Sequence, residues 1–493
     1  MNSWNRRDFL RIAFAGAAAS TLRPAAALAE LADRREKWNV LFIAVDDLRP
    51  ELGCYGHPAI QSPNIDKLAA AGLLFTHAYC QQAICAPSRA SLLTGLRPDS
   101  TKIYDLRHPV SQHLPDVLTL PQHFRRNGYK TISLGKIYHH HTDDRPGWTE
   151  RPSAWRGLYH SKGIEADRGR RRAEGQKKGL TGSRLYNYAA GPSTECLDVP
   201  DNAYSDGAIA DKAVEAVRKY KDGPFFLAAG FLKPHLPFTA PRKYWDLYDR
   251  GRIALPDPKE PSDAPRIAFT NWGELRAYTD IPKSGDLDEE KTRQLVHGYY
   301  ACVTYVDGQI GRILDELDRL DLRRRTIVIL WGDHGWKLGE YGDWCKHTNF
   351  ELDTRVPMLL SVPGTKGGRK CHALTEFVDI YPTLAELCGL EVPKHCEGTS
   401  MAPLLAEPDR KWKSAAFSQY PRGRIMGYSM RTRRWRYTEW IDGNTRQAVA
   451  RELYDHEKDP FAHANVVSKP QHAALVKRLA AMMKAGWRGA LPK

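Results

Sequence analysis

The chain has 493 residues and a formal net charge of +15, and 42% of its residues are hydrophobic. This length exceeds one minimal core, so we expect two or three domains, or one large α/β domain with an appendage. The apolar share excludes a largely disordered protein. A basic surface attracts nucleic acid, anionic membrane or acidic polysaccharide. No zinc-finger spacing or aromatic RNA-binding run occurs, so we expect no nucleic-acid partner.

Residues 1–29 have the pattern of a twin-arginine export signal. Adjacent Arg6 and Arg7 precede Phe9 and an alanine-rich apolar run, which closes on a small-x-small sequence at residues 27–29. The alternative is an ordinary amphipathic helix. The run is too short for a membrane span, and no later segment reaches about 18 uninterrupted apolar residues. We therefore predict the twin-arginine translocase as a partner, no stable membrane insertion, and a periplasmic or secreted protein.

Apolar runs that end in polar residues alternate with amphipathic segments along most of the chain. Buried strands are predicted within residues 38–47, 128–140, 223–238 and 324–335. Helices are predicted within residues 62–75 (stopping near Gly72), after Cys85, and within residues 206–220 and 290–320. This alternation predicts right-handed βαβ units and an α/β fold, with a large, mostly parallel sheet sandwiched by helices. We assign residues 36–400 to this main domain.

Two regions depart from the alternation. Residues 150–200 contain a charge run without apolar periodicity, which predicts a solvated or mobile surface loop, or a basic rim that holds an anionic polymer. After about residue 400, antiparallel strands, a turn and a closing helix predict a smaller α+β C-terminal subdomain over residues 401–493. The nine cysteines form no C-x-x-C pair, although Cys388 and Cys396 are close enough along the chain to pair across a turn.

Four of the predicted strands end in charged or metal-binding residues. These residues are Asp46 with Asp47, Lys136 with His139, Lys233 with His235, and Asp333 with His334. In open α/β sheets, ligands bind beyond the carboxyl ends of the strands. Because four strands deliver such residues, we expect one functional site at that edge of the sheet.

The carboxylates in this set indicate a metal site. Asp46, Asp47 and Asp333 are hard oxygen ligands, to which His334 adds an imidazole, and this set suits calcium or magnesium better than zinc. Taken alone, the two adjacent aspartates also fit a helix cap. A dication beside lysines, arginines and histidines favours an anionic ester substrate, and phosphate and sulfate esters both fit. Cys85 is the candidate nucleophile, but a thiolate is a poor partner for a hard cation.

A resemblance to a known family removes this mismatch. The sequence CAPSR, from Cys85 to Arg89, resembles the C-x-P-x-R signature of type I sulfatases, the formylglycine-dependent members of the alkaline phosphatase-like superfamily. Together with VDDLRP, GKIYHH, KPHLPF and GDHG in the family's order, the similarity to the iduronate-2-sulfatase branch runs from residue 38 to about residue 466, except over residues 150–200. The resemblance implies that a formylglycine-generating maturation enzyme oxidises Cys85 to Cα-formylglycine. Its hydrated aldehyde is the family's nucleophile and suits a hard cation.

The resemblance also implies a role for each site residue. The calcium ligands would be Asp46, Asp47, Asp333, His334 and the formylglycine at position 85. Arg89 and Lys136 would hold the nucleophile, and His139 would take a proton from it. His235 and Lys346 would bind the sulfate and protonate the leaving oxygen. His139 is followed by His140 and His141, so its assignment could be off by one. His347, the next residue, is the alternative to Lys346 for the sulfate-binding role.

We therefore predict a sulfuric ester hydrolase that removes sulfate from sulfated uronate residues of glycans, similar to iduronate-2-sulfate. One alternative is a phosphodiester or phosphonate monoester hydrolase on the same fold. Another is a non-catalytic, calcium-dependent binder of sulfated glycan, if Cys85 is never modified. Because the twin-arginine route carries folded proteins, we also expect Cys85 to be oxidised in the cytoplasm before transport.

Overall fold

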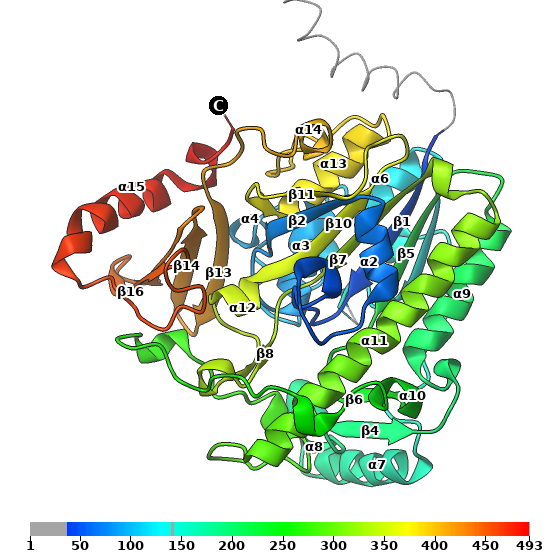
Figure 1. Cartoon of the computed structure of the whole chain (residues 1–493), viewed down its shortest axis with the longest axis horizontal. Coiled ribbons are helices and arrows are strands. Elements are labelled where there is room, and N and C mark those ends of the chain that lie inside the picture. The colour runs from blue at the N-terminus through cyan, green and yellow to red at the C-terminus, as the bar shows by residue number, and fades with distance from the viewer. Residues whose placement is uncertain (1–36, 140–141, 493) are drawn as a thin grey trace, which may run out of the picture.

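The structure is a computed structural model that describes residues 37–139 and 142–492, so the predicted export signal lies outside the described residues. An eight-stranded sheet forms its centre (Figure 1). Its strands are β1 (Asn39–Val45), β2 (Leu73–Tyr79), β3 (Lys130–Gly135), β5 (Phe225–Phe231), β7 (Thr326–Gly332), β10 (Arg355–Ser361), β11 (Arg369–Cys371) and β12 (Thr375–Glu376). Their order is β11-β2-β10-β7-β1-β5-β3, with β12 also paired to β2.

Parallel pairing brings the carboxyl ends of four strands together. Strand β1 pairs in parallel with β5 and β7, and β3 pairs in parallel with β5. Strand β10 runs antiparallel between β7 and β2. The predicted fold class, a large, mainly parallel α/β sheet, is thus confirmed. Strands β2 and β10 were not predicted from the sequence.

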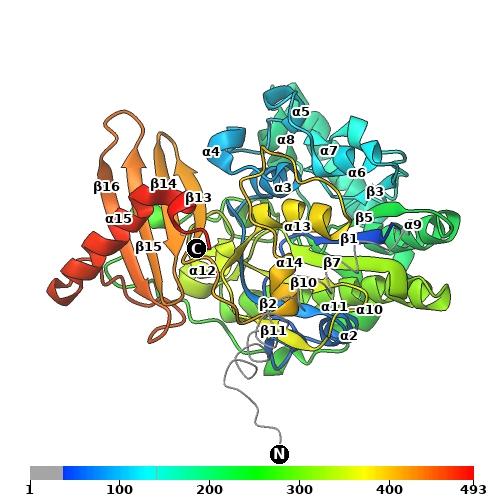
Figure 2. The same cartoon turned by 90° about the horizontal axis from the view of Figure 1, so that it is seen from above.

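Helices cover both faces of the sheet, as Figures 1 and 2 show together. Successive strand residues point to opposite faces: Leu41 and Ile43 of β1 lie in one core, and Val40 and Phe42 lie in the other. The first core includes residues of α2 (Pro63–Ala70), α9 (Ser205–Lys219) and α11 (Glu289–Arg319). The second includes residues of α3 (Cys85–Thr94), α6 (Leu120–Arg126) and α13 (Ile380–Leu387). Burial on both faces explains why β1 reads as an uninterrupted apolar run.

The basic stretch at residues 150–200 contains two helices, α7 (Lys162–Lys177) and α8 (Gly182–Tyr188), so the prediction of a loop there is wrong. Ion pairs one turn apart along α7, such as Arg168 with Glu165 and Arg171 with Asp167, support the helix without an apolar stripe. The remaining short elements are α4 (Pro98–Thr101), α5 (Val110–His113), α10 (Arg242–Trp245), α12 (Glu351–Thr354), α14 (Ala402–Ala406), β4 (Thr194–Leu197), β6 (Phe238–Pro241), β8 (Lys337–Leu338) and β9 (Trp344–Cys345).

A second, antiparallel sheet follows near the C-terminus. It is formed by β13 (Ala416–Arg422), β14 (Ile425–Arg431), β15 (Trp435–Asp442) and β16 (Ala448–Asp455), and α15 (Ala473–Gly489) closes the chain. Met430, Tyr437 and Leu453 of the sheet pack against Leu479 of α15. In Figure 2 this sheet stands beside the main sheet, and β13 is its strand nearest to the main sheet. The N–H of Gln419 in β13 donates to the carbonyl of Gln81, four residues before Cys85.

Two further findings bear on the sequence-based predictions. All nine cysteines lie in the described part of the chain and are free thiols, so Cys388 and Cys396 do not form a disulfide. Among residues 37–139 and 142–492, no helix combines the length and the apolar character that crossing a membrane requires.

Candidate active site

Five segments deliver polar side chains to the carboxyl edge of the central sheet. Asp46 and Asp47 follow β1, Lys136 follows β3, His235 follows β5, Asp333 and His334 follow β7, and Cys85 is the first residue of α3. All of these side chains except that of His235 are buried. The sequence therefore located the edge, and the structure adds the distances between the side chains.

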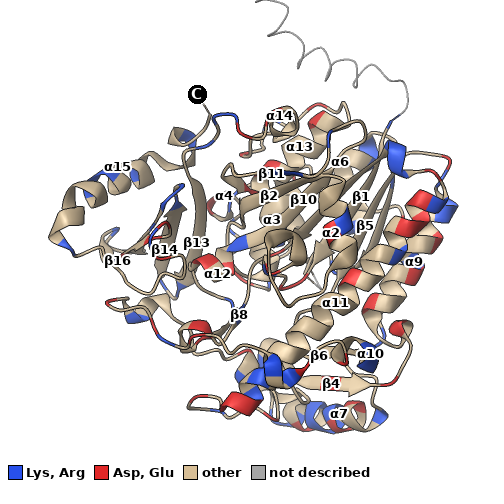
Figure 3. Cartoon of the chain, in the orientation of Figure 1, with Lys and Arg blue, Asp and Glu red and all other residues tan. Residues whose placement is uncertain are grey.

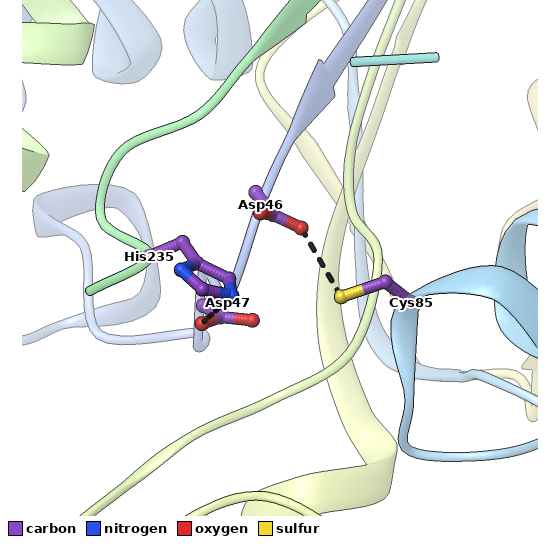
Figure 4. A group of neighbouring side chains, drawn as sticks. All are labelled: Asp46, Asp47, Cys85 and His235. Carbon is purple, nitrogen blue, oxygen red and sulfur yellow. Dashed lines mark hydrogen bonds and ion pairs between the residues drawn. The ribbon is translucent and has the colours of Figure 1, made fainter. Parts of the chain in front are cut away.

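Cys85 lies at the centre of the cluster. Its Sγ is 3.5 Å from Asp46 Oδ1, 3.3 Å from His334 Nε2 and 3.5 Å from Lys136 Nζ. Figure 4 shows the sulfur directed at Asp46, while His235 lies over Asp47. Burial raises the pKa of the Cys85 thiol well above its ordinary range, and the charge of Asp46 adds to the rise. The unmodified side chain is therefore a protonated thiol rather than an activated thiolate.

Arg89 and Lys136 surround the same carboxylates. The fully buried Arg89 guanidinium donates to Asp46 Oδ1 at 3.1 Å and to Asp333 Oδ2 at 2.9 Å, and it also bonds the backbone carbonyl of Lys136. Lys136 Nζ donates to Asp46 Oδ2 at 2.5 Å. One turn of α3 separates Arg89 from Cys85, so the helix places the thiol and the guanidinium on the same side. This spacing explains the C-x-x-x-R pattern in structural terms.

His139 lies near the same strand end. Its side chain is half-buried, and its carbonyl oxygen accepts hydrogen bonds from the N–H and the hydroxyl of Thr142. Residues 140 and 141 are outside the described ranges. The choice of His139 as the base stays a prediction.

On the other side of Asp47, cations gather around a carboxylate that the sequence reading missed. Lys346 Nζ lies 3.1 Å from both oxygens of Asp47 and 2.9 Å from Glu274 Oε1. The Nε2 atoms of His235 and His347 each lie 3.1 Å from an oxygen of Glu274. Burial opposes ionisation of Glu274, but Lys346 and the hydrogen bonds from His235 and His347 hold its pKa well below the usual range. Glu274 follows no strand and belongs to no recognised motif, so no sequence signal marked it.

Lys233, which also follows β5, does not reach this cluster. Its buried Nζ donates to the carbonyls of His235 and Pro237 at 2.6 Å each. The backbone N–H groups of Leu232 and Lys233 donate to Asp206. Lys233 and Asp206 therefore fix the loop that presents His235. Lys233 had appeared in the sequence as one of the charged strand ends, and its role is to support the neighbouring histidine.

The carboxyl edge also borders a cavity of about 280 Å³. Lys136, Arg151, Ser153, Trp155 and Ser205 are among its lining residues. Trp155 is 52% exposed, which is unusual for a residue of this size. The cavity thus combines hydroxyl groups, an aromatic face and the ion pair of Arg151 with Asp143 beside Lys136.

The donor set fits a hard divalent cation. One ligand atom from each of Asp46, Cys85, Asp333 and His334 lies within 4.8 Å of every other, and the same is true of Asp46, Asp47, Cys85 and His235. Two oxygens that each lie about 2.4 Å from one calcium ion are at most about 4.8 Å apart. Three carboxylates also match the preference of calcium for oxygen ligands. Within each set the donor spacing is therefore compatible with a calcium ion, and Asp46 and Cys85 belong to both sets.

The fold and this cation-rich edge define a hydrolase of anionic esters. The sulfatase family model matches residues 38–390, and the model of the N-sulphoglucosamine sulphohydrolase C-terminal region matches residues 339–487. The chain belongs to the sulfatase family, so it is a sulfatase, an enzyme that hydrolyses sulfate esters. The predicted membership of the type I sulfatases is confirmed.

Named relatives refine this placement. The chain is 36% identical to iduronate 2-sulfatase of Mus musculus, over 90% of this chain and 93% of that protein. A solved structure bound to its substrate D-glucosamine-2-N,6-O-disulfate has a TM-score of 0.73 at 22% identity, and covers 92% of this chain and 98% of its own. The phosphonate monoester hydrolase of Silicibacter pomeroyi has a TM-score of 0.72 at 21% identity, and covers 92% and 96%. The two solved structures support the fold alone.

Proposed function

We propose that this sulfatase removes the 2-sulfate from a uronate residue of a glycan, with a Cα-formylglycine made from Cys85 as its nucleophile and one bound calcium ion. The observation that carries the proposal is the position of Cys85, between Lys136, Asp46 and His334, within a chain 36% identical to an iduronate 2-sulfatase. The pKa of the thiol supports it as well, since the buried cysteine is not itself an activated nucleophile.

Asp46, Asp47, Asp333, His334 and the modified residue 85 would hold the calcium ion. The ion would supply positive charge toward the ester oxygens, and the hydrated aldehyde would supply an oxygen nucleophile with a second hydroxyl. Arg89 donates hydrogen bonds to both Asp46 and Asp333, so it orients these carboxylates and contributes positive charge to the site. Lys136, 3.5 Å from Sγ, holds the attacking oxygen and stabilises its anionic form.

Lys346 and His235 bind the substrate on the other side of Asp47. The Lys346 ammonium is a compact charge that suits a sulfate oxygen. His235 donates its Nε2 proton to the sugar oxygen as the S–O bond breaks, which avoids expelling an alkoxide. Once the sulfate has been transferred to residue 85, His139 takes a proton from the second hydroxyl of that residue. The C–O bond to the sulfate then breaks, inorganic sulfate leaves and the aldehyde is restored.

The glycan part of the substrate has a place beside Lys136. An aromatic face such as that of Trp155 packs against the apolar side of a sugar ring, and Arg151, which pairs with Asp143, presents a guanidinium at the same cavity. The net charge of +15 favours a polyanionic chain over a neutral one. These features support a sulfated uronate glycan rather than a small sulfate ester without further charge.

A substrate panel tests the proposal. The matured, calcium-loaded protein is offered disaccharides that end in iduronate-2-sulfate or glucuronate-2-sulfate, a glucosamine-6-sulfate, and a phosphonate monoester, and the released sulfate or alcohol is measured. We expect the uronate 2-sulfates to have the highest kcat/KM, and Cys85→Ala to be inactive. Faster turnover of the phosphonate monoester would replace the proposal by the alternative hydrolase. Binding without turnover of any ester would favour the non-catalytic reading.

Export is the second part of the proposal. We infer that the twin-arginine translocase carries the folded protein to the periplasm or the exterior after Cys85 has been oxidised. A variant with Arg6→Lys and Arg7→Lys would then accumulate in the cytoplasm with formylglycine already at position 85. A cytoplasmic precursor that carries only unmodified cysteine, alongside exported protein with formylglycine, would contradict this order of events.

A further inference from the structure

Glu274 contacts the two groups that the proposed function assigns to the sulfate ester. Its Oε1 lies 2.9 Å from Lys346 Nζ and 3.1 Å from His235 Nε2. Its other oxygen lies 3.1 Å from His347 Nε2, and Nδ1 of that histidine lies 2.7 Å from the hydroxyl of Tyr420. A carboxylate therefore holds the place where an anionic substrate would make its contacts.

His235 cannot serve Glu274 and a leaving oxygen at the same time. Its Nδ1 lies 2.6 Å from the carbonyl of Leu236, which can only accept, so Nδ1 is the donor in that bond. The only other ring nitrogen is Nε2, the atom that faces Glu274. An imidazole nitrogen makes one in-plane hydrogen bond, so the leaving oxygen must replace Glu274 at Nε2 before the proton can be transferred.

The same limit on hydrogen-bond donors applies to Lys346. An ammonium has three N–H donors, and Lys346 Nζ has three close oxygens, two of Asp47 at 3.1 Å and one of Glu274 at 2.9 Å. A sulfate oxygen can gain a short contact with this ammonium when Glu274 gives up its own.

Glu274 lies in a segment that buried neighbours anchor, and its own side chain is partly exposed. The neighbouring residues Trp272 and Leu275 are buried, and the Arg276 guanidinium covers the Trp272 ring. Glu274 itself exposes 21% of its side chain, compared with 3% for Lys346. Glu274 is thus the more exposed partner of this ion pair, and in the exchange proposed below its side chain would rotate toward solvent.

We propose that Glu274 is a specificity-determining internal anion, which occupies the sulfate position of the unliganded enzyme and is displaced by the sulfate group. The inference rests on the proposed roles of Lys346 and His235. Displacement leaves two negative charges near each other, so Glu274 weakens the binding of substrate and of product sulfate alike. Release of inorganic sulfate is thereby made easier, and only an anionic group can compete for the site.

The test compares Glu274→Gln with the matched control Glu260→Gln. Glu260 lies on the same irregular segment but pairs with Arg266 on the surface. Inhibition of the matured enzyme by inorganic sulfate gives Ki. We expect Glu274→Gln to lower Ki by about tenfold to thirtyfold, as expected for two unit charges about 8–12 Å apart at an effective dielectric constant of about 20. We expect Glu260→Gln to leave Ki unchanged.

A second variant and a second readout keep the test decisive. Glu274→Asp withdraws the carboxylate but keeps its charge, so its Ki should lie between those of wild type and Glu274→Gln. Calorimetric titration of calcium-loaded Cys85→Ala protein with sulfate, with and without Glu274→Gln, reads binding without turnover. An unchanged or weaker sulfate affinity together with a lower kcat would overturn the inference and make Glu274 a positioning residue. Failure of the proposed function would instead show as no sulfate release by wild type, whatever the calorimetry reports.

Discussion

Replacing His235 with glutamine removes the proton that the account gives to the leaving oxygen and keeps a side chain of similar size. Because Nδ1 is committed to the Leu236 carbonyl at 2.6 Å, Nε2 is the only ring atom that can act as the acid. General acid catalysis contributes about 10²–10⁴-fold in rate, which corresponds to about 3–5 kcal/mol of barrier. We expect kcat on a sugar sulfate to fall by that factor in His235→Gln.

The assay compares two leaving groups on one variant. A sugar alcohol needs protonation as it departs, whereas a nitrophenolate is stable as an anion, so His235→Gln should lose no more than about tenfold on an aryl sulfate. His108→Gln, a change in an exposed histidine paired with Asp105, serves as the control. Equal losses on both esters would refute the acid role and leave His235 as a binding residue only.

Three further predictions concern stability and the glycan contact. Lys337→Met removes the charged partner, 2.6 Å away, of the fully buried Asp353, which keeps its hydrogen bonds from Thr348. Chemical denaturation should therefore show a loss of about 3–5 kcal/mol, partly restored by adding Asp353→Leu. Burial opposes ionisation of Glu376, but Arg97 and Lys413 lower its pKa from 4.5 to about 2. The ionised Glu376 therefore contributes about 3 kcal/mol to the free energy of unfolding above pH 4.5, and this contribution is lost as the pH falls toward 2. The free energy of unfolding should thus fall less steeply over this pH range in Glu376→Gln than in wild type. Trp155→Ala should raise KM for an oligosaccharide about fivefold to tenfold and leave KM for an aryl sulfate unchanged. Equal changes in the two KM values would show that the glycan does not contact Trp155.

The sequence predicted strands β1, β3, β5 and β7 of the central sheet because these strands have a physical signature. Residues 39–45 and 326–332 are apolar throughout, since both faces of β1 and β7 are covered by helices. Polar residues directly after such runs must lie at the carboxyl edge, and the structure places Asp46, Asp333 and His334 there. Periodicity and topology were therefore enough to predict that these residues lie together at one edge of the sheet.

Other features have no local signal. Strand β2 follows α2 after only two residues, so the apolar residues from Leu73 onward read as the end of that helix. Helix α7 has no apolar stripe that would predict a helix. Its ion pairs can be recognised only once the backbone is known to be helical. Glu274 contacts cationic side chains that lie more than 35 residues away in the chain, and these contacts form only in the folded protein. Long-range charge pairing is the part of this site that sequence patterns could not reveal.

The mass of the peptide that contains residue 85 tests the central claim most directly. The measurement uses protein purified from a host that supplies the maturation enzyme. Conversion of the Cys85 thiol to an aldehyde lowers the peptide mass by about 18 Da, a product outside the usual ladder of cysteine oxidation. The account predicts this shift in the active protein, with sulfate release in proportion to the converted fraction. An unmodified cysteine in protein that still releases sulfate would contradict it.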